Sequence, residues 1–241
     1  MSKYNWYTGK VIEIINETPN IKRFIFEIPE LNEFEFKPGQ FVILDPEKKF
    51  NLPSREYSIS SPPGNGNIFE LIIVLNENGK LTPFLFDKIK IESEMQVSSA
   101  LGKFLLPVKL EKELCFICTG VGIAPFRSMY LNILNNKIPH TGINLIFGTR
   151  HQKDMCYTEE LYKLEKENPS FHFFPTLSRE FSPDWKGRNG YVHSIYKELY
   201  SDFHPAYFYI CGWKNMIFET RDNLISFGYN RSDIKFELYD K

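Results

Sequence analysis

The stretch Arg55-Glu56-Tyr57-Ser58-Ile59-Ser60-Ser61, followed by Pro62-Pro63, is the part of the 241-residue chain that says most about its fold. Along a β-strand, successive side chains point to opposite faces, so Arg55, Tyr57 and Ile59 share one face. A strand end of this composition offers a guanidinium for a phosphate, a ring for stacking and a hydroxyl for a hydrogen bond. A flat, phosphorylated ligand such as a flavin nucleotide requires these groups. For this stretch taken alone, an edge strand with ordinary surface residues is the alternative.

The first half of the chain reads as short strands separated by turns that are rich in proline, glycine and asparagine. Strands are expected at residues 9–15, 21–27, 40–44, 56–60, 68–75 and 94–99. Several short strands at this spacing are typical of a barrel. In the turn that follows the strand at residues 68–75, Thr82 is expected to cap a short helix that has Pro83 at its first position. The backbone N–H groups at the start of such a helix are free to bind an anion.

From Leu114 on, apolar strands alternate with helical patterns, which is typical of βαβ units and a parallel sheet. Strands are expected at residues 114–119, 142–147, 171–177, 206–210 and 234–238, and helices at 125–135, 158–168 and from about 213 to 227. The predicted fold class is β plus α/β. An antiparallel β-barrel domain at residues 1–108 precedes a doubly wound parallel-sheet domain at residues 109–241.

The charge, the apolar runs and the cysteines of the chain argue against several classes of protein. The net charge of −1 lacks the basic excess typical of nucleic-acid proteins. No apolar run approaches the roughly 20 residues needed to cross a bilayer, and the first ten residues lack a signal-peptide pattern, so we expect a cytoplasmic protein. The 4 cysteines are too scattered for a disulfide framework. Cys115 and Cys118 would face opposite sides of a strand, which favours small core residues over a redox or metal pair, and no metal-ligand spacing is evident.

Two further segments suit a pyridine nucleotide. Glycines in the turn Thr119-Gly120-Val121-Gly122-Ile123-Ala124-Pro125 let the backbone approach a pyrophosphate, although any tight βα turn needs glycine. Ser178-Arg179 follows a strand and suits the 2′-phosphate of NADPH, with Arg188 and Tyr191 as a second cation and an adenine-stacking ring. The alternative is that Ser178-Arg179 is an ordinary surface pair, in which case the nucleotide could be NADH instead of NADPH.

In order and spacing these segments resemble the ferredoxin–NADP(+) reductase superfamily. The resemblance implies that Arg55 holds the flavin phosphate, Tyr57 stacks on the isoalloxazine ring and Ser58 hydrogen-bonds near its N5. It assigns further contacts with FAD, rather than FMN, to Ile72, Gly79, Lys80, Leu81 and Thr82. It assigns the pyridine nucleotide to Thr119, Gly120, Gly122, Pro125, Cys211, Gly212 and Met216.

The end of the chain resembles the family less closely. In the plant-type reductases a terminal aromatic covers the flavin face, with a carboxylate two positions before it. Tyr239 and Glu237 have this spacing, but Asp240 and Lys241 follow the tyrosine. A stacking Tyr239 and a frayed edge strand are both consistent with this pattern.

The resemblance implies a flavoprotein that moves hydride between NADPH and FAD, and electrons on to a small acidic carrier such as ferredoxin or flavodoxin. Ser58, Cys211, Glu237 and Tyr239 form its expected catalytic set. An NADH-dependent flavin reductase or an oxygenase reductase component shares these motifs. A nucleotide-binding sensor or assembly subunit is the non-enzymatic alternative. We expect a monomer with no nucleic-acid partner and no membrane span.

Overall fold

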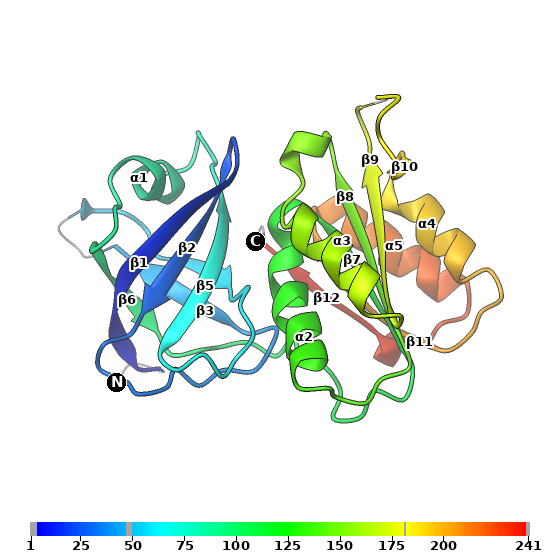
Figure 1. The fold of residues 1–241 in the computed structure, drawn as a ribbon, viewed down its shortest axis with the longest axis horizontal. Helices are drawn as coiled ribbons and strands as arrows, with labels where there is room; N and C mark the ends of the chain where they lie inside the picture. Colours follow the sequence, from blue (N-terminus) through cyan, green and yellow to red (C-terminus); the bar gives the residue numbers. More distant parts are fainter. Residues whose placement is uncertain (1–3, 47–49, 181, 240–241) are drawn as a thin grey trace. The chain divides into compact units, whose positions relative to one another are not determined.

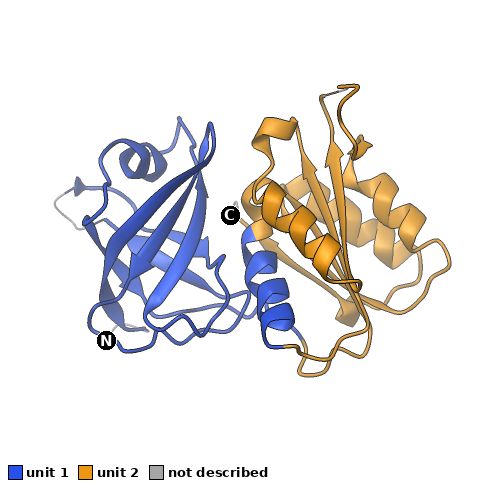
Figure 2. Cartoon of the chain, in the orientation of Figure 1, with its two compact units in different colours: residues 1–106, 124–136 blue, residues 107–123, 137–241 orange. Residues whose placement is uncertain are grey.

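The computed structural model describes residues 4–46, 50–180 and 182–239. The chain forms two compact units (Figure 2). Unit 1 comprises Met1–Leu106 together with Ala124–Asn136, and unit 2 comprises Pro107–Ile123 together with Lys137–Lys241. Helix α2 (Ala124–Asn135) therefore belongs to unit 1, although the strands before and after it in the chain belong to unit 2.

Unit 1 is an antiparallel barrel (Figure 1). Its sheet has the order β4-β3-β6-β1-β2-β5. The strands are β1 (Trp6–Thr18), β2 (Ile21–Glu27), β3 (Phe41–Asp45), β4 (Arg55–Ser58), β5 (Ile68–Val74) and β6 (Glu94–Ser98). The two edge strands meet where Ile59 pairs with Leu71, and the Ser60 N–H donates to the Glu70 carbonyl at 2.8 Å. This closure leaves the sheet with paired edges, as the strand pattern predicted.

The barrel interior follows from the two-residue period of its strands. Phe24 and Phe26 on β2 are fully buried while the residues between and beside them are partly exposed. The Phe26 ring stacks on Phe69 of β5 with ring centroids 5.4 Å apart. Such aromatic pairs add to the free energy that burial of apolar surface contributes.

The expected capping of the short helix is wrong. Helix α1 spans Leu81–Asp87, and Lys80 stands at its N-cap without a side-chain capping bond. The Thr82 hydroxyl accepts a hydrogen bond from the Asn76 N–H (2.9 Å) and donates one to the Asn76 carbonyl (3.1 Å). Because the turn before the helix uses this hydroxyl, Thr82 closes the turn and lies inside the first helical turn, with Pro83 one position further along.

Unit 2 is a parallel sheet with the order β10-β9-β8-β7-β11-β12. Figure 1 shows α3 on one face of the sheet and α4 and α5 on the other, so the sheet is doubly wound as predicted. Its strands are β7 (Glu113–Thr119), β8 (Ile143–Thr149), β9 (Phe171–Leu177), β10 (Arg188–Asn189), β11 (Ala206–Gly212) and β12 (Ile234–Leu238). Its helices are η2 (Gly120–Ile123), η3 (Gln152–Asp154), α3 (Thr158–Glu167), α4 (Val192–Leu199), α5 (Lys214–Ser226) and η4 (Arg231–Asp233).

Two strand ends in unit 2 differ from expectation. Strand β8 continues through Gly148 and Thr149, beyond its expected end at residue 147, and β11 continues through Cys211 and Gly212, beyond its expected end at residue 210. Neighbouring strands supply partners for these extra residues, since Thr149 pairs with Leu177 and Gly212 with Leu238. Helix α4 and the short strand β10 were not predicted. No helix among residues 4–46, 50–180 and 182–239 is long and apolar enough to cross a membrane.

A polar cluster lies at the amino ends of the central strands of unit 2. The Glu113 carboxylate accepts hydrogen bonds from Asn144 Nδ2 (2.7 Å) and from the Tyr200 hydroxyl (2.8 Å). His204 Nε2 lies 3.2 Å from the same carboxylate, and its Nδ1 lies 2.6 Å from Asp202. Burial lowers the pKa of His204, but the hydrogen bonds with the two carboxylates outweigh it, so the net pKa is raised.

This cluster predicts a pH-dependent stability. Because His204 has a folded-state pKa above its ordinary value of 6.5, its contribution is complete below that value and is lost as the pH rises through the folded-state pKa. We expect the stability advantage of the natural protein over His204→Gln to shrink between about pH 6 and pH 8. Urea unfolding at several pH values measures it. An advantage that is constant or grows with pH would contradict the assignment.

Candidate functional site

Strand β4 presents its three predicted flavin residues in three different environments. Arg55 is exposed, and its Nη1 donates to the Ser54 carbonyl at 2.9 Å. Tyr57 packs partly buried against the barrel core. Burial raises the pKa of Tyr57, and the charge of Arg55 opposes this shift. Ser58 is buried, with 6% of its surface exposed. An accessible cation, a half-covered ring and a buried hydroxyl on one strand fit a flavin nucleotide in residue type and exposure.

The second group of predicted FAD residues divides into core and turn. Ile72 and Leu81 are almost completely buried in unit 1. Gly79 and Lys80 lie in the turn before α1, where the Gly79 N–H donates to the Asn76 carbonyl at 2.9 Å. Only the turn residues are therefore placed to meet a ligand with exposed groups, while Ile72 and Leu81 support the strand and helix around them.

The carboxyl ends of β7 and β11 form the switch point of the parallel sheet. The chain runs from β7 outward through β8 to β10 and returns to β11 on the other side of β7. Ligands of open α/β sheets bind in the crevice at such a point. Thr119 ends β7, Gly212 ends β11, and the Trp213 N–H donates to the Thr119 hydroxyl at 3.0 Å. The structure thus brings together the two glycine-containing segments that lie 90 residues apart in the chain.

Glycine is required on both sides of this contact. A Cβ on Gly122 would lie 2.5 Å from the Cys211 carbonyl oxygen, and a Cβ on Gly212 would overlap Thr119. Gly120 differs, because it has a φ of +54° and a Cβ there would meet nothing within 4 Å. The turn therefore offers open space over its backbone at Gly120, which is the form of cradle that a phosphate group requires.

Three of the four expected catalytic residues gather at this end of the sheet. Cys211 and Glu237 are directly paired on β11 and β12. Burial raises the pKa of Cys211 well above its ordinary value, the Glu237 carboxylate raises it further, and a hydrogen bond with Tyr239 opposes the shift. Cys211 is therefore a neutral thiol suited to packing and not to nucleophilic attack. Asp240 and Lys241, which follow Tyr239, lie outside the described residues.

The predicted 2′-phosphate residues lie at the ends of β8 and β9. The Ser178 N–H and hydroxyl donate to the Thr149 carbonyl (3.0 and 3.3 Å), and the Arg179 N–H donates to the Arg150 carbonyl at 3.0 Å. Arg150 and Arg179 are both exposed. Arg150 was not predicted, because the strand was expected to end at residue 147, whereas β8 extends to Thr149 and sets Arg150 beside Arg179.

Arg188 and Tyr191 differ in their availability. Strand β10 pairs with the end of β9, where Arg188 lies opposite Thr176, and Tyr191 follows β10 at the N-cap of α4. Arg188 forms a two-pronged ion pair with Glu198 of α4, in which Nη2 lies 2.8 Å from Oε1. This hydrogen bonding lowers the pKa of Glu198. Tyr191 is 72% exposed. The ring is therefore accessible to an adenine, while the guanidinium already has a carboxylate partner.

Two predicted nucleotide residues remain, Pro125 and Met216, and an unpredicted residue, Trp213, lies near Met216 in the sequence. Pro125 is the second residue of α2 and is buried, as is Met216, which lies in the core beneath α5. These two support the turns that precede them. Trp213 was not predicted, yet it is 65% exposed at the N-cap of α5. Its place within Cys211-Gly212-Trp213 was visible in the sequence, but its exposure was not, because tryptophan is mostly buried in folded proteins.

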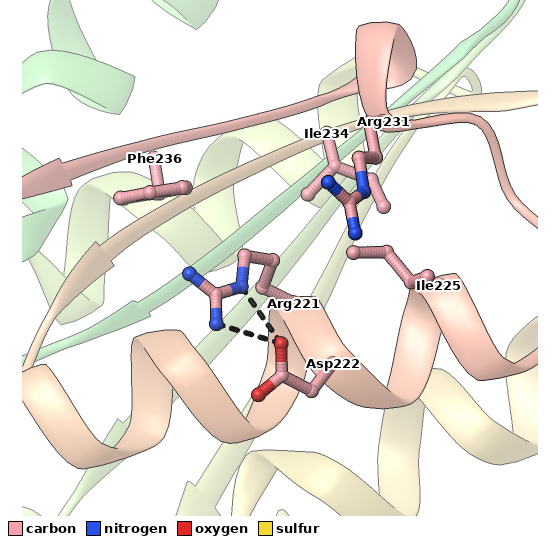
Figure 3. A pocket seen from close by; sticks show the side chains of 6 residues that line it. All are labelled: Arg221, Asp222, Ile225, Arg231, Ile234 and Phe236. Carbon is pink, nitrogen blue, oxygen red and sulfur yellow. Dashed lines mark hydrogen bonds and ion pairs between the residues drawn. The ribbon is translucent and has the colours of Figure 1, made fainter.

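A separate pocket of about 380 Å³ lies along the edge strand of unit 2 (Figure 3). It contains none of the predicted site residues and is lined by Arg221, Asp222, Ile225, Arg231, Ile234 and Phe236. Arg221 pairs with Asp222 at 2.7 Å and lies over the Phe218 and Phe236 rings. The charged residues of this pocket belong to α5 and η4, and edge strand β12 contributes the apolar Ile234 and Phe236.

Family models match both halves of the chain. The oxidoreductase FAD-binding domain matches residues 8–105, and the oxidoreductase NAD-binding domain matches residues 116–222. The first match contains strand β4 and the turn before α1. The second contains the switch-point loops and the segment from Ser178 to Tyr191.

Several characterised proteins are similar along most of the chain. Ferredoxin–NADP reductase B of Sorangium cellulosum is 27% identical, with 97% of this chain and 98% of the relative covered. The reductase component of phenol 2-monooxygenase from Pseudomonas sp. strain CF600 is 28% identical over 88% of this chain, which spans only 59% of that relative.

A solved ferredoxin–NADP(+) reductase from Neisseria gonorrhoeae, with bound FAD and NADP, superimposes with a TM-score of 0.80 at 26% identity. The match covers 97% of this chain and 98% of that structure. The barrel, the parallel sheet and the two consecutive domain matches agree with this likeness. The chain belongs to the ferredoxin–NADP(+) reductase superfamily of FAD- and NAD(P)-binding oxidoreductases.

Proposed function

We propose that the protein oxidises NADPH through bound FAD and passes the electrons to a small acidic one-electron carrier of the ferredoxin or flavodoxin type. The observation that carries the proposal is the switch point, where Thr119, Gly122 and Gly212 pack backbone against backbone and leave space over Gly120. Strand β4 supplies the flavin-type residues of the same chain. The two sets together support a site for a flavin and a site for a pyridine nucleotide.

Each residue has a definite task in this proposal. When bound, FAD and NADPH supply the redox chemistry, in which a hydride leaves the nicotinamide and electrons leave the flavin. Arg55 binds a flavin phosphate, Tyr57 covers the ring and the Ser58 hydroxyl hydrogen-bonds near N5. Cys211 fills the nicotinamide pocket as a neutral thiol, held by Tyr239 and next to Glu237.

NADPH is favoured over NADH by the cations at the end of β9. Arg150 and Arg179 are exposed and adjacent, and an arginine pairs with a phosphate through parallel hydrogen bonds. Ser178 adds a hydroxyl and Tyr191 an exposed ring. Arg188 contributes less in this arrangement, because Glu198 competes with a phosphate for the same guanidinium.

The relatives suggest two kinds of electron acceptor. The Sorangium relative, which the chain matches over 98% of its length, is named a ferredoxin–NADP reductase. The Pseudomonas relative is a reductase component of a monooxygenase, of which the chain spans 59%. An oxygenase component is therefore the second candidate acceptor. Carrier-dependent turnover with a ferredoxin, a flavodoxin or neither separates these possibilities from a free-flavin reductase.

An anaerobic absorbance titration tests the proposed function. The purified protein, supplemented with FAD, is titrated with NADPH and separately with NADH. We expect a bound flavin band that bleaches at lower NADPH than NADH concentrations. A protein that binds no FAD, or that binds FAD which neither nucleotide bleaches, would instead support a binding module without turnover.

The Ser58→Ala variant tests the flavin strand. Loss of the hydroxyl is expected to lower the rate of hydride transfer about tenfold or more while FAD retention changes little, because the hydroxyl acts near the reacting atom. Stopped-flow reduction by NADPH measures the rate, and the flavin spectrum after gel filtration measures retention. Ser54→Ala, an exposed serine just before the strand, is the matched control and should match the natural protein. An unchanged rate in Ser58→Ala refutes the role.

The Arg179→Ala variant tests the cofactor preference. Removing one charge-assisted phosphate contact is expected to lower kcat/KM for NADPH about tenfold or more and to leave that for NADH nearly unchanged. Arg150→Ala should act in the same direction, and Arg188→Ala should act less because of its pairing with Glu198. Steady-state kinetics with both nucleotides measures it. Equal losses for the two nucleotides would rule out recognition of the 2′-phosphate by these arginines.

A further inference from the structure

A buried ion cluster stands next to the flavin strand in unit 1. The Glu70 carboxylate, on β5, has 8% of its side chain exposed and faces two arginines. Arg23 of β2 donates to Glu70 Oε2 from Nε (3.1 Å) and Nη2 (2.7 Å). Arg127 of α2 donates from Nη1 to Glu70 Oε1 at 3.1 Å. The cluster therefore joins two barrel strands and one helix at a single carboxylate.

Arg127 also holds the continuation of strand β4. The same Nη1 donates to the Ser60 carbonyl at 3.1 Å, and the Ser60 hydroxyl donates to Glu70 Oε1 at 2.8 Å. Ser60 lies two residues after Ser58, so the guanidinium is bonded to the backbone of the segment that carries the flavin residues. Both donors and both acceptors are buried, which makes their geometry well defined.

Helix α2 also packs through apolar side chains. Phe126, Met129, Tyr130 and Ile133 are all fully buried, and the Phe126 ring lies 5.9 Å from that of Phe104. Hydrophobic contacts resist separation but have little directional preference. Two charge-assisted hydrogen bonds fix the rotation and the axial position of the helix as well. Burying the Arg127 guanidinium carries a desolvation cost, which apolar side chains at the same place would avoid. We therefore take the directional precision of its hydrogen bonds as the reason that the helix has an arginine here.

Helix α2 continues directly from the turn that contains Gly120. The turn Gly120–Ile123, with its open space over Gly120, runs without interruption into Ala124, the first residue of α2. Arg127 follows four residues after Ile123, within the first turn of the helix. One side chain therefore connects the helix that continues the nucleotide loop to the strand that continues the flavin motif.

We propose that Arg127 is a positioning residue for hydride transfer, which holds α2 against the continuation of the flavin strand through Glu70 and the Ser60 carbonyl. The inference rests on the proposed function. A displacement of about 1 Å in a reacting geometry can lower a rate about a hundredfold, so an imprecise anchor lowers the rate of transfer rather than the affinity for nucleotide.

Arg127→Gln, compared with Arg23→Gln, tests the inference. Each substitution removes one arginine from Glu70, but only the first releases α2, because Arg23 stands on β2. Both are expected to lower the thermal midpoint. Arg127→Gln should lower the rate of FAD reduction at saturating NADPH about tenfold or more, with little change in KM and in FAD content. Arg23→Gln should keep the rate within about twofold, and Arg127→Lys should be intermediate because it restores one charge but not the two-acceptor geometry.

The outcomes distinguish a failure of the role of Arg127 from a failure of the proposed function. Equal rates in Arg127→Gln and Arg23→Gln, or a rate loss in proportion to lost FAD, would show a structural role only and overturn the inference. If Arg127→Gln does not fold, Arg127→Lys against Arg23→Lys makes the same comparison. If the natural protein binds FAD that neither nucleotide reduces, the proposed function itself fails, and the inference fails with it.

Discussion

The backbone contact between the ends of β7 and β11 is the constraint on which unit 2 depends. Gly122 packs on the Cys211 carbonyl and Gly212 on Thr119, at distances that leave no room for a side chain. Two strands that are far apart in the sequence are thereby held so closely that their loops act as one surface. Helix α5 begins directly after this contact, with the Trp213 N–H bonded to the Thr119 hydroxyl. A pyridine nucleotide site built here depends on the absence of side chains as much as on their presence.

Unit 1 depends on a different interaction, the carboxylate of Glu70. A buried charge is costly unless it is paired and hydrogen-bonded, and here two arginines and the Ser60 hydroxyl surround it. The carboxylate belongs to β5, and the backbone of the same residue closes the barrel against Ser60. The closure of the barrel and the seat of α2 are therefore one structural element.

The sequence predicted the fold because the fold rests on local periodicity. Alternation in Phe24 to Phe26 and the change to buried strands after Leu114 each reflect burial that repeats along the chain. The sequence also placed the glycine-containing loops and Ser178-Arg179 at strand ends, because such turns follow directly from residue type. The helix Val192–Leu199 carries an apolar spacing at Val192, Ile195, Tyr196 and Leu199 that would have revealed it.

What could not be predicted depends on partners distant in the chain. The Thr82 hydroxyl bonds to Asn76 instead of capping a helix, and Arg188 is held by Glu198 across ten residues. Strands β8 and β11 extend further than expected because adjacent strands pair with their last residues. Arg127 of α2 is bonded to Glu70, a carboxylate 57 positions earlier in the sequence. None of these partners is marked by residue type or period, so only the folded chain reveals them.

The distribution of cysteine gives the molecule a built-in reporter. The chain has 4 cysteines, and all of them lie in unit 2 as free thiols with no exposed surface. A thiol reagent in solution can reach them only when the core of unit 2 opens, so the rate of labelling measures local unfolding of that unit, while unit 1 contributes no signal. The protein thus carries, without engineering, a probe that distinguishes opening of the parallel sheet from opening of the barrel.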